Sequence, residues 1–213
     1  MSSLRISEIF LSLQGESRSV GFPTVFIRLT GCPLRCQYCD TSYAFQGGER
    51  MQLEEIIEQV LQYRVQHVCV TGGEPLAQKE SLALMSALCE KGYEVSLETS
   101  GALDISEVDT RVVKVMDLKT PASGEMDKNC YENITHLTRH DQVKFVICNR
   151  EDYQWAKEML LHHDLPGCCE VLFSPSFDQQ KPAELAQWII DDHLPVRFQL
   201  QLHKILWGEE PGR

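Results

Sequence analysis

The pattern of apolar and polar positions predicts buried strands that alternate with amphipathic helices. Short continuous apolar runs bounded by turn residues are typical of strands that are buried on both faces of a parallel sheet. Such runs are found at 25–29, 68–70, 112–116, 143–148 and 171–173. We therefore expect a largely parallel sheet whose strands are joined by right-handed crossover connections.

Helical periodicity lies between several of these runs. Apolar residues at 53, 56, 57, 60 and 61 follow the spacing of one stripe on an amphipathic helix. A second helix carries an apolar stripe over 82–89 and ends at Gly92, because glycine suits the left-handed position after a helix. Two further helices are expected over 152–163 and 183–193, the latter opening after Pro182.

Polar or glycine-bearing motifs follow three of the expected strands. They are Thr71-Gly72-Gly73-Glu74, Glu98-Thr99-Ser100-Gly101 and Asp117-Leu118-Lys119. Because the carboxyl ends of parallel strands meet at one edge, these motifs should face a common opening. A chain of 213 residues is short for a full eight-unit barrel. The predicted fold class is therefore α/β, a partial (β/α) barrel in a single domain.

Composition excludes several classes of protein. Hydrophobic residues make up 43% and charged residues 24% of the chain, which indicates a globular rather than a disordered protein. A net charge of −11 disfavours binding to nucleic acid, whose phosphates attract basic surfaces. No apolar run is long enough for a transmembrane helix, and residues 1–5 lack the pattern of a signal peptide. We expect a cytoplasmic protein without nucleic-acid or membrane partners.

The nine cysteines are unevenly distributed. Cys32, Cys36 and Cys39 form a C-x-x-x-C-x-x-C motif, and the others are scattered. The scattered residues Cys69, Cys89 and Cys148 lie in apolar patterns and are interpreted as small hydrophobic residues, and the adjacent Cys168 and Cys169 after a Pro-Gly turn as inert.

Three thiolates on one loop cannot complete an all-cysteine zinc site, which needs four. A zinc ion would require a further ligand, for which Asp40 and His67 are nominal candidates. Three cysteines instead suit a [4Fe-4S] cluster with one iron left open to a small molecule. We therefore expect Cys32, Cys36 and Cys39 to hold such a cluster.

This spacing resembles that of the radical S-adenosylmethionine (SAM) enzymes. Residues 71–75 (TGGEP) are similar to a motif of that superfamily, and Tyr38 matches an aromatic position beside the third cysteine. The resemblance implies that the open iron binds SAM and that electron transfer cleaves its sulfonium to a 5′-deoxyadenosyl radical. It also implies that Tyr38 lies against the adenine, and that Gly73 and Glu74 accept the methionine ammonium.

The flanking residues are similar to the 7-carboxy-7-deazaguanine synthase family. The N-terminal signals are LQGE at 13–16, FIRLTGC at 26–32 and CDT at 39–41. Weaker matches follow in order at 98–101, 117–119, 173–176 and 201–204. The resemblance implies an abbreviated, modified radical SAM barrel that converts 6-carboxy-5,6,7,8-tetrahydropterin to 7-carboxy-7-deazaguanine with loss of ammonia, in queuosine biosynthesis. It regenerates SAM.

The resemblance also implies the roles of individual residues. The predicted pterin contacts are Leu13, Gln14, Gly15, Glu16, Arg28, Thr99 and His203. The predicted SAM contacts are Tyr38, Cys39, Asp40, Gly73, Glu74, Gly101, Asp117, Leu118, Lys119, Ser174, Pro175, Ser176 and Phe177. Thr41 matches the one protein ligand of a magnesium ion, which should arrive with substrate oxygens and waters.

Two of these residues also have a structural interpretation. A guanidinium in an apolar strand needs an anion, and the fork of Arg28 matches a carboxylate. Arg28 is therefore expected to bind the substrate carboxylate, and the alternative is a structural pair with a glutamate such as Glu16. Lys119 is expected to neutralise the SAM carboxylate or order its ribose, and the alternative is a solvated lysine.

The family further implies a homodimer and a flavodoxin or ferredoxin as reducing partner. We expect one radical SAM domain over 1–213, with a core at about 22–200, an N-terminal substrate-binding segment at 1–21 and a C-terminal tail at 201–213. Some family chains end in a proline whose carboxylate binds substrate, whereas here Pro211 is followed by two residues. Residues 42–50 are expected to form a short loop without a partner-docking insertion.

Two other functions fit parts of the sequence. An activating enzyme for a glycyl-radical protein also carries the C-x-x-x-C-x-x-C motif, although it lacks the LQGE and FIRLTGC segments. A zinc-binding interaction module would use the cysteines as structural ligands.

Overall fold

The computed structural model describes residues 2–208, 210 and 212. The described chain forms one nine-stranded sheet in the order β3-β1-β2-β4-β5-β6-β7-β8-β9. The strands are β1 (Ser3–Leu13), β2 (Pro23–Leu29), β3 (Glu49–Gln52), β4 (His67–Gly72), β5 (Glu94–Thr99), β6 (Val113–Asp117), β7 (Gln142–Ile147), β8 (Glu170–Pro175) and β9 (Arg197–Phe198). The first strand and the last in this order do not pair with each other, so the barrel is open.

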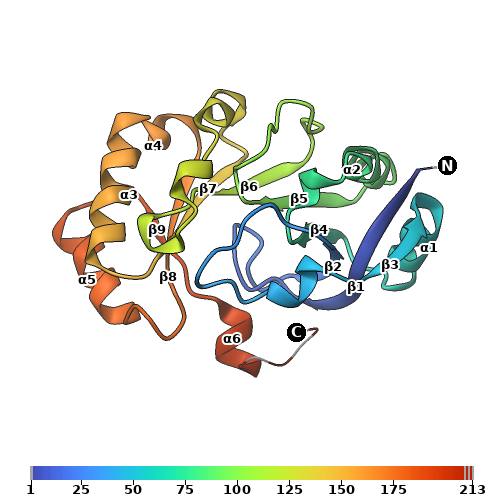
Figure 1. Cartoon of the computed structure of the whole chain (residues 1–213), viewed down its shortest axis with the longest axis horizontal. Helices are drawn as coiled ribbons and strands as arrows, with labels where there is room; N and C mark the ends of the chain where they lie inside the picture. Colours follow the sequence, from blue (N-terminus) through green and yellow to red (C-terminus); the bar gives the residue numbers. More distant parts are fainter. Residues whose placement is uncertain (1, 209, 211, 213) are drawn as a thin grey trace.

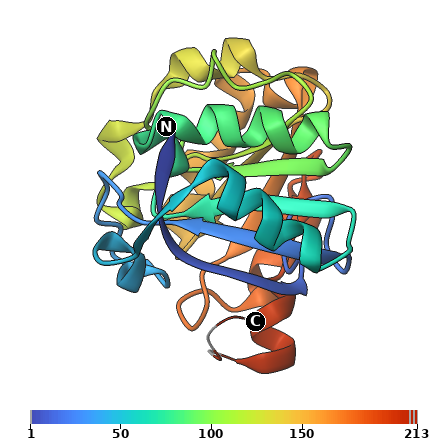
Figure 2. The same cartoon turned by 90° about the vertical axis from the view of Figure 1, so that its right-hand side faces the viewer.

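Six α-helices accompany the described strands. They are α1 (Leu53–Gln62), α2 (Glu80–Glu90), α3 (Arg150–His162), α4 (Leu165–Cys168), α5 (Pro182–Asp191) and α6 (Leu202–Trp207). Short 3₁₀ helices occupy Ser42–Phe45, Pro75–Ala77, Pro121–Ser123, Met126–Lys128 and Tyr131–His136. The sheet curves around a central space, with α1 to α5 on its outer side (Figure 1). The short α6 lies apart from them, at the lower end near the C-terminus (Figure 2).

The pairing of strands confirms the predicted parallel sheet and extends it. From β2 through β9 every neighbouring pair is parallel. The strand β1 is antiparallel to both β2 and β3. This antiparallel N-terminal edge was not predicted, because β1 has only weak alternation and β3 is a short polar segment. The N-terminal residues are therefore part of the same sheet as the rest of the chain.

The hydrophobic core lies between the sheet and the outer helices. Val143, Phe145 and Ile147 of β7 are fully buried and belong to this core. Because successive side chains of a strand point to opposite faces, Lys144 and Val146 face the inner side of the curve. The same alternation in the other parallel strands separates an apolar outer face from a partly polar inner face. The curved sheet thereby places its polar residues on one concave surface.

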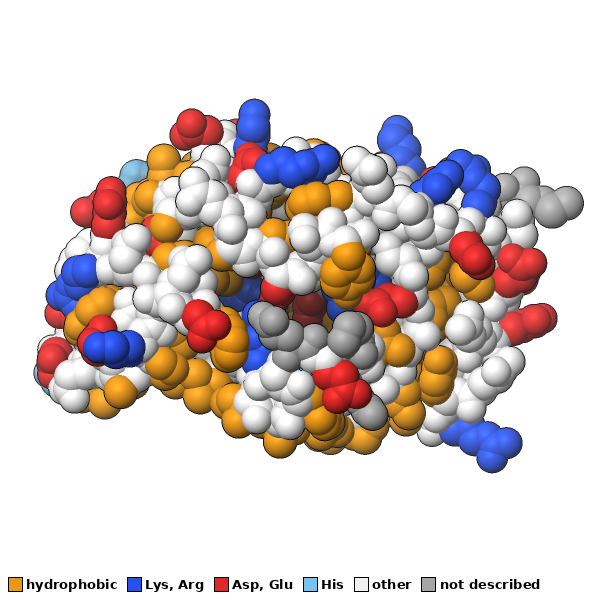
Figure 3. Space-filling model, turned by 60° about the horizontal axis from the view of Figure 1, so that its bottom comes forward, with side chains coloured by type: hydrophobic (Ala, Val, Ile, Leu, Met, Phe, Trp, Pro, Cys, Tyr) orange, Lys and Arg blue, Asp and Glu red, His pale blue; other side chains and the backbone are white. Residues whose placement is uncertain are grey.

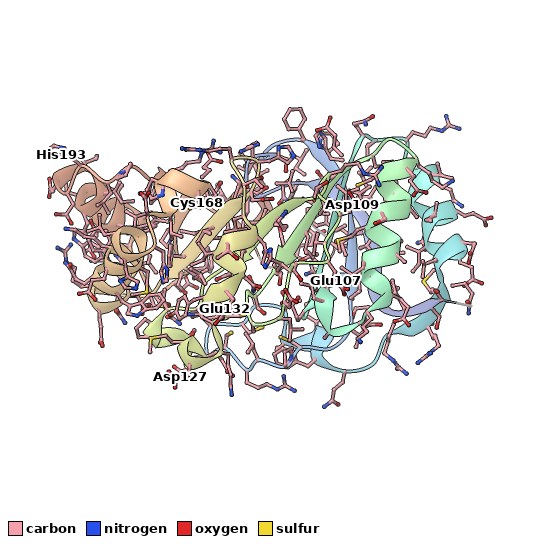
Figure 4. All side chains as sticks on the ribbon, turned by 90° about the horizontal axis from the view of Figure 1, so that it is seen from above. Glu107, Asp109, Asp127, Glu132, Cys168 and His193 are labelled. Atoms are coloured by element: carbon pink, nitrogen blue, oxygen red, sulfur yellow. The ribbon has the colours of Figure 1, made fainter. Side chains whose placement is uncertain are left out.

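The expected helices are present, with small shifts at their ends. Gly92 follows α2 with φ +86°, as predicted for the residue after a helix. The predicted Pro-Gly turn is instead the short helix α4, which contains Cys168 and is followed by buried Cys169. Cys168 is labelled in Figure 4, at helix α4, and it does not line the central cavity described below.

The segment 42–50 differs from the expected loop. It forms a 3₁₀ helix at Ser42–Phe45 and then enters β3, which pairs with the start of β1. Gly48 has φ +70°, and a Cβ there would lie 2.6 Å from the carbonyl oxygen of Ile6. The close approach of this segment to β1 therefore depends on glycine.

Candidate active site

A cavity of about 420 Å³ opens on the concave side of the sheet. Most of the predicted site residues line it: Leu13, Gln14, Glu16, Arg28, Cys32, Cys36, Tyr38, Cys39, Asp40, Thr41, Gly73, Thr99, Asp117, Lys119, Ser174, Pro175, Ser176, Phe177 and His203. Figure 3 shows a hollow near the centre of one face, with basic and acidic side chains visible inside it. Residues that we predicted to contact the cluster, SAM and the pterin therefore line one cavity.

The three cysteines of the motif lie on the loop that follows β2, and each is partly buried with a free thiol. This loop is held against the end of β4: the amide of Glu74 donates to the carbonyl of Gly31 at 2.8 Å, and the amide of Gly73 to that of Leu29 at 3.1 Å. A Cβ on Gly73 would lie about 2.1 Å from the Gly31 carbonyl oxygen and 3.0 Å from the Cβ of Cys32. Glycine at 73 therefore permits the approach of the two segments.

The donor set on this loop suits an iron–sulfur cluster. Burial raises the pKa of Cys32 and Cys39, and raises that of Cys36 to about 11. These thiols therefore stay protonated at neutral pH unless a metal displaces their protons. Among the described residues, no group of three or more His, Cys, Asp or Glu side chains converges on a single metal ion, so the three cysteines are not arranged as a mononuclear site such as that of zinc. His67 lies at the opposite end of β4 from the motif, where its ring packs at a tilt against Phe22 and its Nδ1 lies 3.5 Å from Glu94, so it is no candidate fourth ligand.

Four charged side chains alternate in sign along the wall of the cavity. The Lys144 Nζ lies 2.7 Å from Glu16 Oε2 and 3.6 Å from Asp117 Oδ2. The Lys119 Nζ lies 3.2 Å from the same Asp117 oxygen. The other Asp117 oxygen, Oδ1, is buried without a hydrogen-bond partner. That atom can accept a hydrogen bond from a bound ligand, and SAM offers ammonium and ribose donors.

Lys119 is not the solvated lysine of the alternative interpretation. Its residue is 8% exposed and its ammonium is paired with Asp117. Burial by itself would lower the pKa of Lys119, but the neighbouring Asp117 carboxylate is the main group that raises it. Lys119 therefore carries a positive charge into the part of the cavity that contains the cysteines.

Arg28 has a protein partner, but a different one from the glutamate considered above. Its Nε donates to Glu8 Oε1 at 2.6 Å, because Glu8 lies directly opposite Arg28 in the antiparallel pairing of β1 and β2. The hydroxyl of Tyr43 donates to the same Glu8 oxygen at 2.8 Å. Glu16 instead pairs with Lys144 and accepts from the amide of Gln201 at 2.9 Å. Arg28 still lines the cavity, so the pair with Glu8 orients its guanidinium there.

Glu74 lies behind the cavity wall, not on it. Its residue is fully buried, and its carboxylate accepts from the Leu76 amide, the Ser100 amide and hydroxyl, and the Thr99 hydroxyl. These bonds join the end of β4 to the end of β5. Gly15, Gly101 and Leu118 are likewise absent from the cavity lining.

The C-terminal helix closes one side of the cavity. The amide of Leu202 donates to the Gly15 carbonyl at 2.9 Å. The Lys204 Nζ lies 3.0 Å from Asp40 Oδ2 and 5.0 Å from the centre of the Phe177 ring. The hydroxyl of Thr41 donates to the other Asp40 oxygen at 2.9 Å. Helix α6 is thus tied to the cysteine loop, to the segment after β8 and to the N-terminal motif, which together brings His203 to the cavity.

Sequence reasoning gave no role to several residues that line the cavity, notably Lys144, Gln201 and Lys204, and it placed Glu98 at the opening without assigning it a contact. Lys144 had a usable signal, because a lysine in the apolar run 143–148 raises the same question as Arg28. Glu98 accepts from the Thr71 hydroxyl at 2.8 Å and from the Gln14 amide at 3.3 Å. No local pattern marked Gln201 or Lys204 as facing the cavity.

Comparisons with known proteins agree with this site. Residues 26–117 match the Radical SAM superfamily. The 7-carboxy-7-deazaguanine synthase of Chlorobaculum tepidum is 45% identical over 210 residues, which cover 97% of this chain and 96% of the relative. The enzyme of the same name from Koribacter versatilis is 42% identical, over 97% of this chain and 98% of the relative.

The fold comparison points the same way. The crystal structure of QueE from Escherichia coli superimposes with a TM-score of 0.78 at 22% identity, covering 94% of this chain and 95% of that one. This likeness shows that the two chains share their overall fold. On the near full-length similarity to its curated relatives, this chain belongs to the 7-carboxy-7-deazaguanine synthase family of the radical SAM superfamily.

Proposed function

We propose that this chain is a 7-carboxy-7-deazaguanine synthase, a radical SAM lyase of 7-deazapurine biosynthesis. In this reaction 6-carboxy-5,6,7,8-tetrahydropterin loses ammonia and contracts to 7-carboxy-7-deazaguanine. The observation that carries the proposal is a single cavity onto which the cysteine motif, Arg28 and a set of paired buried charges open. The similarity of its relatives over nearly their whole length supports it.

Cys32, Cys36 and Cys39 would hold the [4Fe-4S] cluster. With SAM bound, the cluster would supply the electron that cleaves SAM, and the radical released from SAM would remove hydrogen from the substrate. The chain's own contribution begins with excluding water, since the cysteines and their neighbours lie on a partly buried loop. Asp117 Oδ1 offers a free acceptor to the cofactor, and Lys119 offers a cation. Tyr38 and the residues 174–177 line the same part of the cavity.

The substrate end of the cavity would be formed by β1, β2 and α6. The guanidinium of Arg28, held by Glu8, would pair with the substrate carboxylate. Gln14 is 2% exposed and lies beside Glu98, so these two side chains could form hydrogen bonds with the amide and amino groups along the edge of the pterin. Thr99 is fixed by Glu74, and His203 approaches from α6. Glu74 would then act as a positioning residue that holds Thr99 and Ser100.

Magnesium, the redox partner and the oligomeric state are further parts of this proposal. Thr41 lines the cavity beside Asp40 and could contribute its hydroxyl to a magnesium ion completed by substrate and waters. We also propose that the protein is a homodimer, that a flavodoxin or ferredoxin reduces it, and that it is located in the cytoplasm. The nine free cysteines support a reducing compartment. In the described part of the chain, no helix has the length and apolar character needed to cross a membrane.

Neither alternative function is favoured. The activating enzyme and the zinc module would both be consistent with three cysteines, but the full-length similarity is to 7-carboxy-7-deazaguanine synthases. Pro211, which we compared with the terminal proline of some family chains, lies outside the described residues.

The test is an anaerobic assay of the reconstituted enzyme with SAM, dithionite, magnesium and 6-carboxy-5,6,7,8-tetrahydropterin. The expected product is 7-carboxy-7-deazaguanine, identified by mass and ultraviolet spectrum. Cleavage of SAM without any deazaguanine would overturn the assigned reaction while leaving radical SAM chemistry in place. Purification with one zinc per chain, without iron or sulfide, would instead favour the zinc module.

A further inference from the structure

Lys144 is a charged residue in a strand whose neighbouring side chains are buried in the hydrophobic core. It lies on β7, between the parallel strands β6 and β8, and its neighbours Val143 and Phe145 are fully buried in the core. Its own side chain is 13% exposed and turns to the cavity. Burying an ammonium is costly unless it is paired, so the groups that pair with it indicate its purpose.

Two carboxylates from different parts of the cavity meet at Lys144. Glu16 follows β1 in the predicted pterin-binding motif, and its carboxylate lies 2.7 Å from the Lys144 Nζ. Asp117 ends β6 in the predicted SAM-binding motif, and its carboxylate lies 3.6 Å away. These residues are far apart in the chain, so the sheet order is what brings them to one ammonium. Lys144 is thus the contact between the substrate end and the cofactor end of the cavity.

The electrostatic setting keeps Lys144 charged. Burial alone would lower its pKa, but Glu16, Asp117 and Glu98 together raise it well above its usual range. A lysine that stays protonated at neutral pH cannot act as a base toward the substrate. Its charge lies between the two carboxylates, where it aligns them, and Asp117 Oδ1 remains without a partner and free for a ligand.

We infer that Lys144 is a positioning residue that orients Glu16 toward the substrate and Asp117 toward the cofactor, and so couples the binding of the two. This inference rests on the proposed function for its substrate half. Its cofactor half depends only on SAM binding, and the two halves can therefore be measured separately.

The experiment compares wild type, Lys144→Met and Lys144→Arg as cluster-loaded enzymes under anoxic conditions. The dissociation constant of labelled SAM is measured without reductant, and the pterin KM, kcat and ratio of 5′-deoxyadenosine to deazaguanine are measured in turnover. For Lys144→Met we expect both the SAM dissociation constant and the pterin KM to rise by about tenfold, the size typical of losing one buried charged hydrogen bond. The ratio of 5′-deoxyadenosine to deazaguanine should rise too, while Lys144→Arg, which keeps the cation, stays closer to wild type.

Lys114→Met is the matched control. Lys114 lies on β6, is 5% exposed, and pairs with Asp141 at 3.2 Å, but it does not line the cavity. It should lower the melting temperature and leave both ligand constants near wild type. If Lys144→Met does not fold, the double variant Lys144→Met/Glu16→Gln removes the unpaired glutamate and still tests the link to Asp117 through SAM binding.

An unchanged SAM dissociation constant and pterin KM in Lys144→Met would overturn the inference. Equal losses of affinity in Lys144→Met and Lys144→Arg would also overturn it. Either result would mean that Lys144 contributes only to packing. Wild-type enzyme that binds SAM but forms no deazaguanine overturns the proposed function instead. In that case the SAM dissociation constants alone decide the role of Lys144.

Discussion

Single residues on the cavity wall are held in place by partners within the protein. Arg28 is oriented by Glu8, Glu16 by Lys144 and Gln201, and Thr99 by Glu74. Such pairs lower the freedom of the side chains before any ligand arrives, which reduces the entropic cost of binding. The contribution of each pair can be tested by removing one partner.

Arg28→Ala should weaken pterin binding, because the substrate carboxylate loses its cation and Glu8 is left without its partner. We expect a loss of about 2–3 kcal/mol, or roughly 30- to 150-fold in the pterin dissociation constant. Cleavage of SAM in the absence of pterin should be retained. Glu8→Gln serves as the control, since it breaks the pair but keeps the guanidinium, and should cost less. Equal pterin affinity in wild type and Arg28→Ala would make Arg28 structural.

Cys36→Ala should abolish assembly of the cluster, because two thiolates cannot replace three as its protein ligands. The measurements are iron and sulfide content, the visible absorption of the reconstituted protein and SAM cleavage. Cys89→Ala is the matched control, as Cys89 lies on α2 and packs against the hydrophobic core. Retained SAM cleavage by Cys36→Ala would refute its assignment as a ligand.

At the scale of elements, the site depends on close contacts between segments that end near one another. The cysteine loop rests on the end of β4 through Gly73, and α6 rests on the N-terminal motif through Gly15. A Cβ on Gly15 would lie about 2.1 Å from His203 Nδ1, so this contact also needs glycine. The motif glycines thus act through packing as well as through backbone conformation.

Gly73→Ala should displace the cysteine loop, because its new methyl group meets the backbone of Gly31, which cannot move like a side chain. We expect reduced iron per chain after reconstitution and weaker SAM binding. The main measurement is the iron content of Gly73→Ala compared with that of Gly15→Ala. In the Gly15→Ala variant the added methyl group would press on α6, so we expect a higher pterin KM with the cluster intact. Full iron loading and unchanged SAM affinity in Gly73→Ala would contradict this account.

At the scale of the whole molecule, two carboxylates that pair with lysines link stability to pH: Glu16, whose side chain is 13% exposed, and Asp40, whose side chain is 50% exposed. Burial alone would raise the pKa of Glu16 and Asp40. Lys144, Gln201 and His203 nonetheless lower the pKa of Glu16 below its ordinary 4.5, and Lys204 and Thr41 lower that of Asp40 to about 2. On unfolding, both groups return to ordinary values and take up protons more readily. Their contribution to stability is therefore complete above about pH 4.5 and is lost as the pH falls toward 2.

The cluster-free chain should show a melting temperature that drops as the pH is lowered below about 4.5, the ordinary value for Glu16. Glu16→Gln should show a smaller drop over the same range, because it lacks one of the two shifted carboxyl groups. Melting curves recorded by circular dichroism from pH 7 to pH 3 provide the measurement. Identical pH dependence in the two proteins would mean that Glu16 titrates alike in the folded and unfolded chain.

Much of the architecture was predictable from local pattern. The apolar runs and helical stripes marked five of the strands and four of the helices, since burial on a parallel sheet and amphipathic periodicity leave a direct trace in sequence. The strands β1 and β3 left little trace in the sequence. The edge strand β3 is short and polar, and β1, which lies between β3 and β2, is partly exposed. The family and its reaction followed from the cysteine spacing and its flanking motifs, because such motifs can be recognised in the sequence without knowing how the residues are placed in space.

The sequence by itself determined which residue types are available: three cysteines at fixed spacing, an arginine and a lysine in apolar strands, and motifs at strand ends. Only the tertiary structure decided the pairing, such as Glu8 with Arg28 and Lys144 between Glu16 and Asp117. It also turned Glu74 away from the cavity, to hold Thr99 and Ser100. The physical reason is that a charge is satisfied by whatever lies within about 3 Å of it. In this fold those neighbours are set by sheet order and register between strands far apart in the chain.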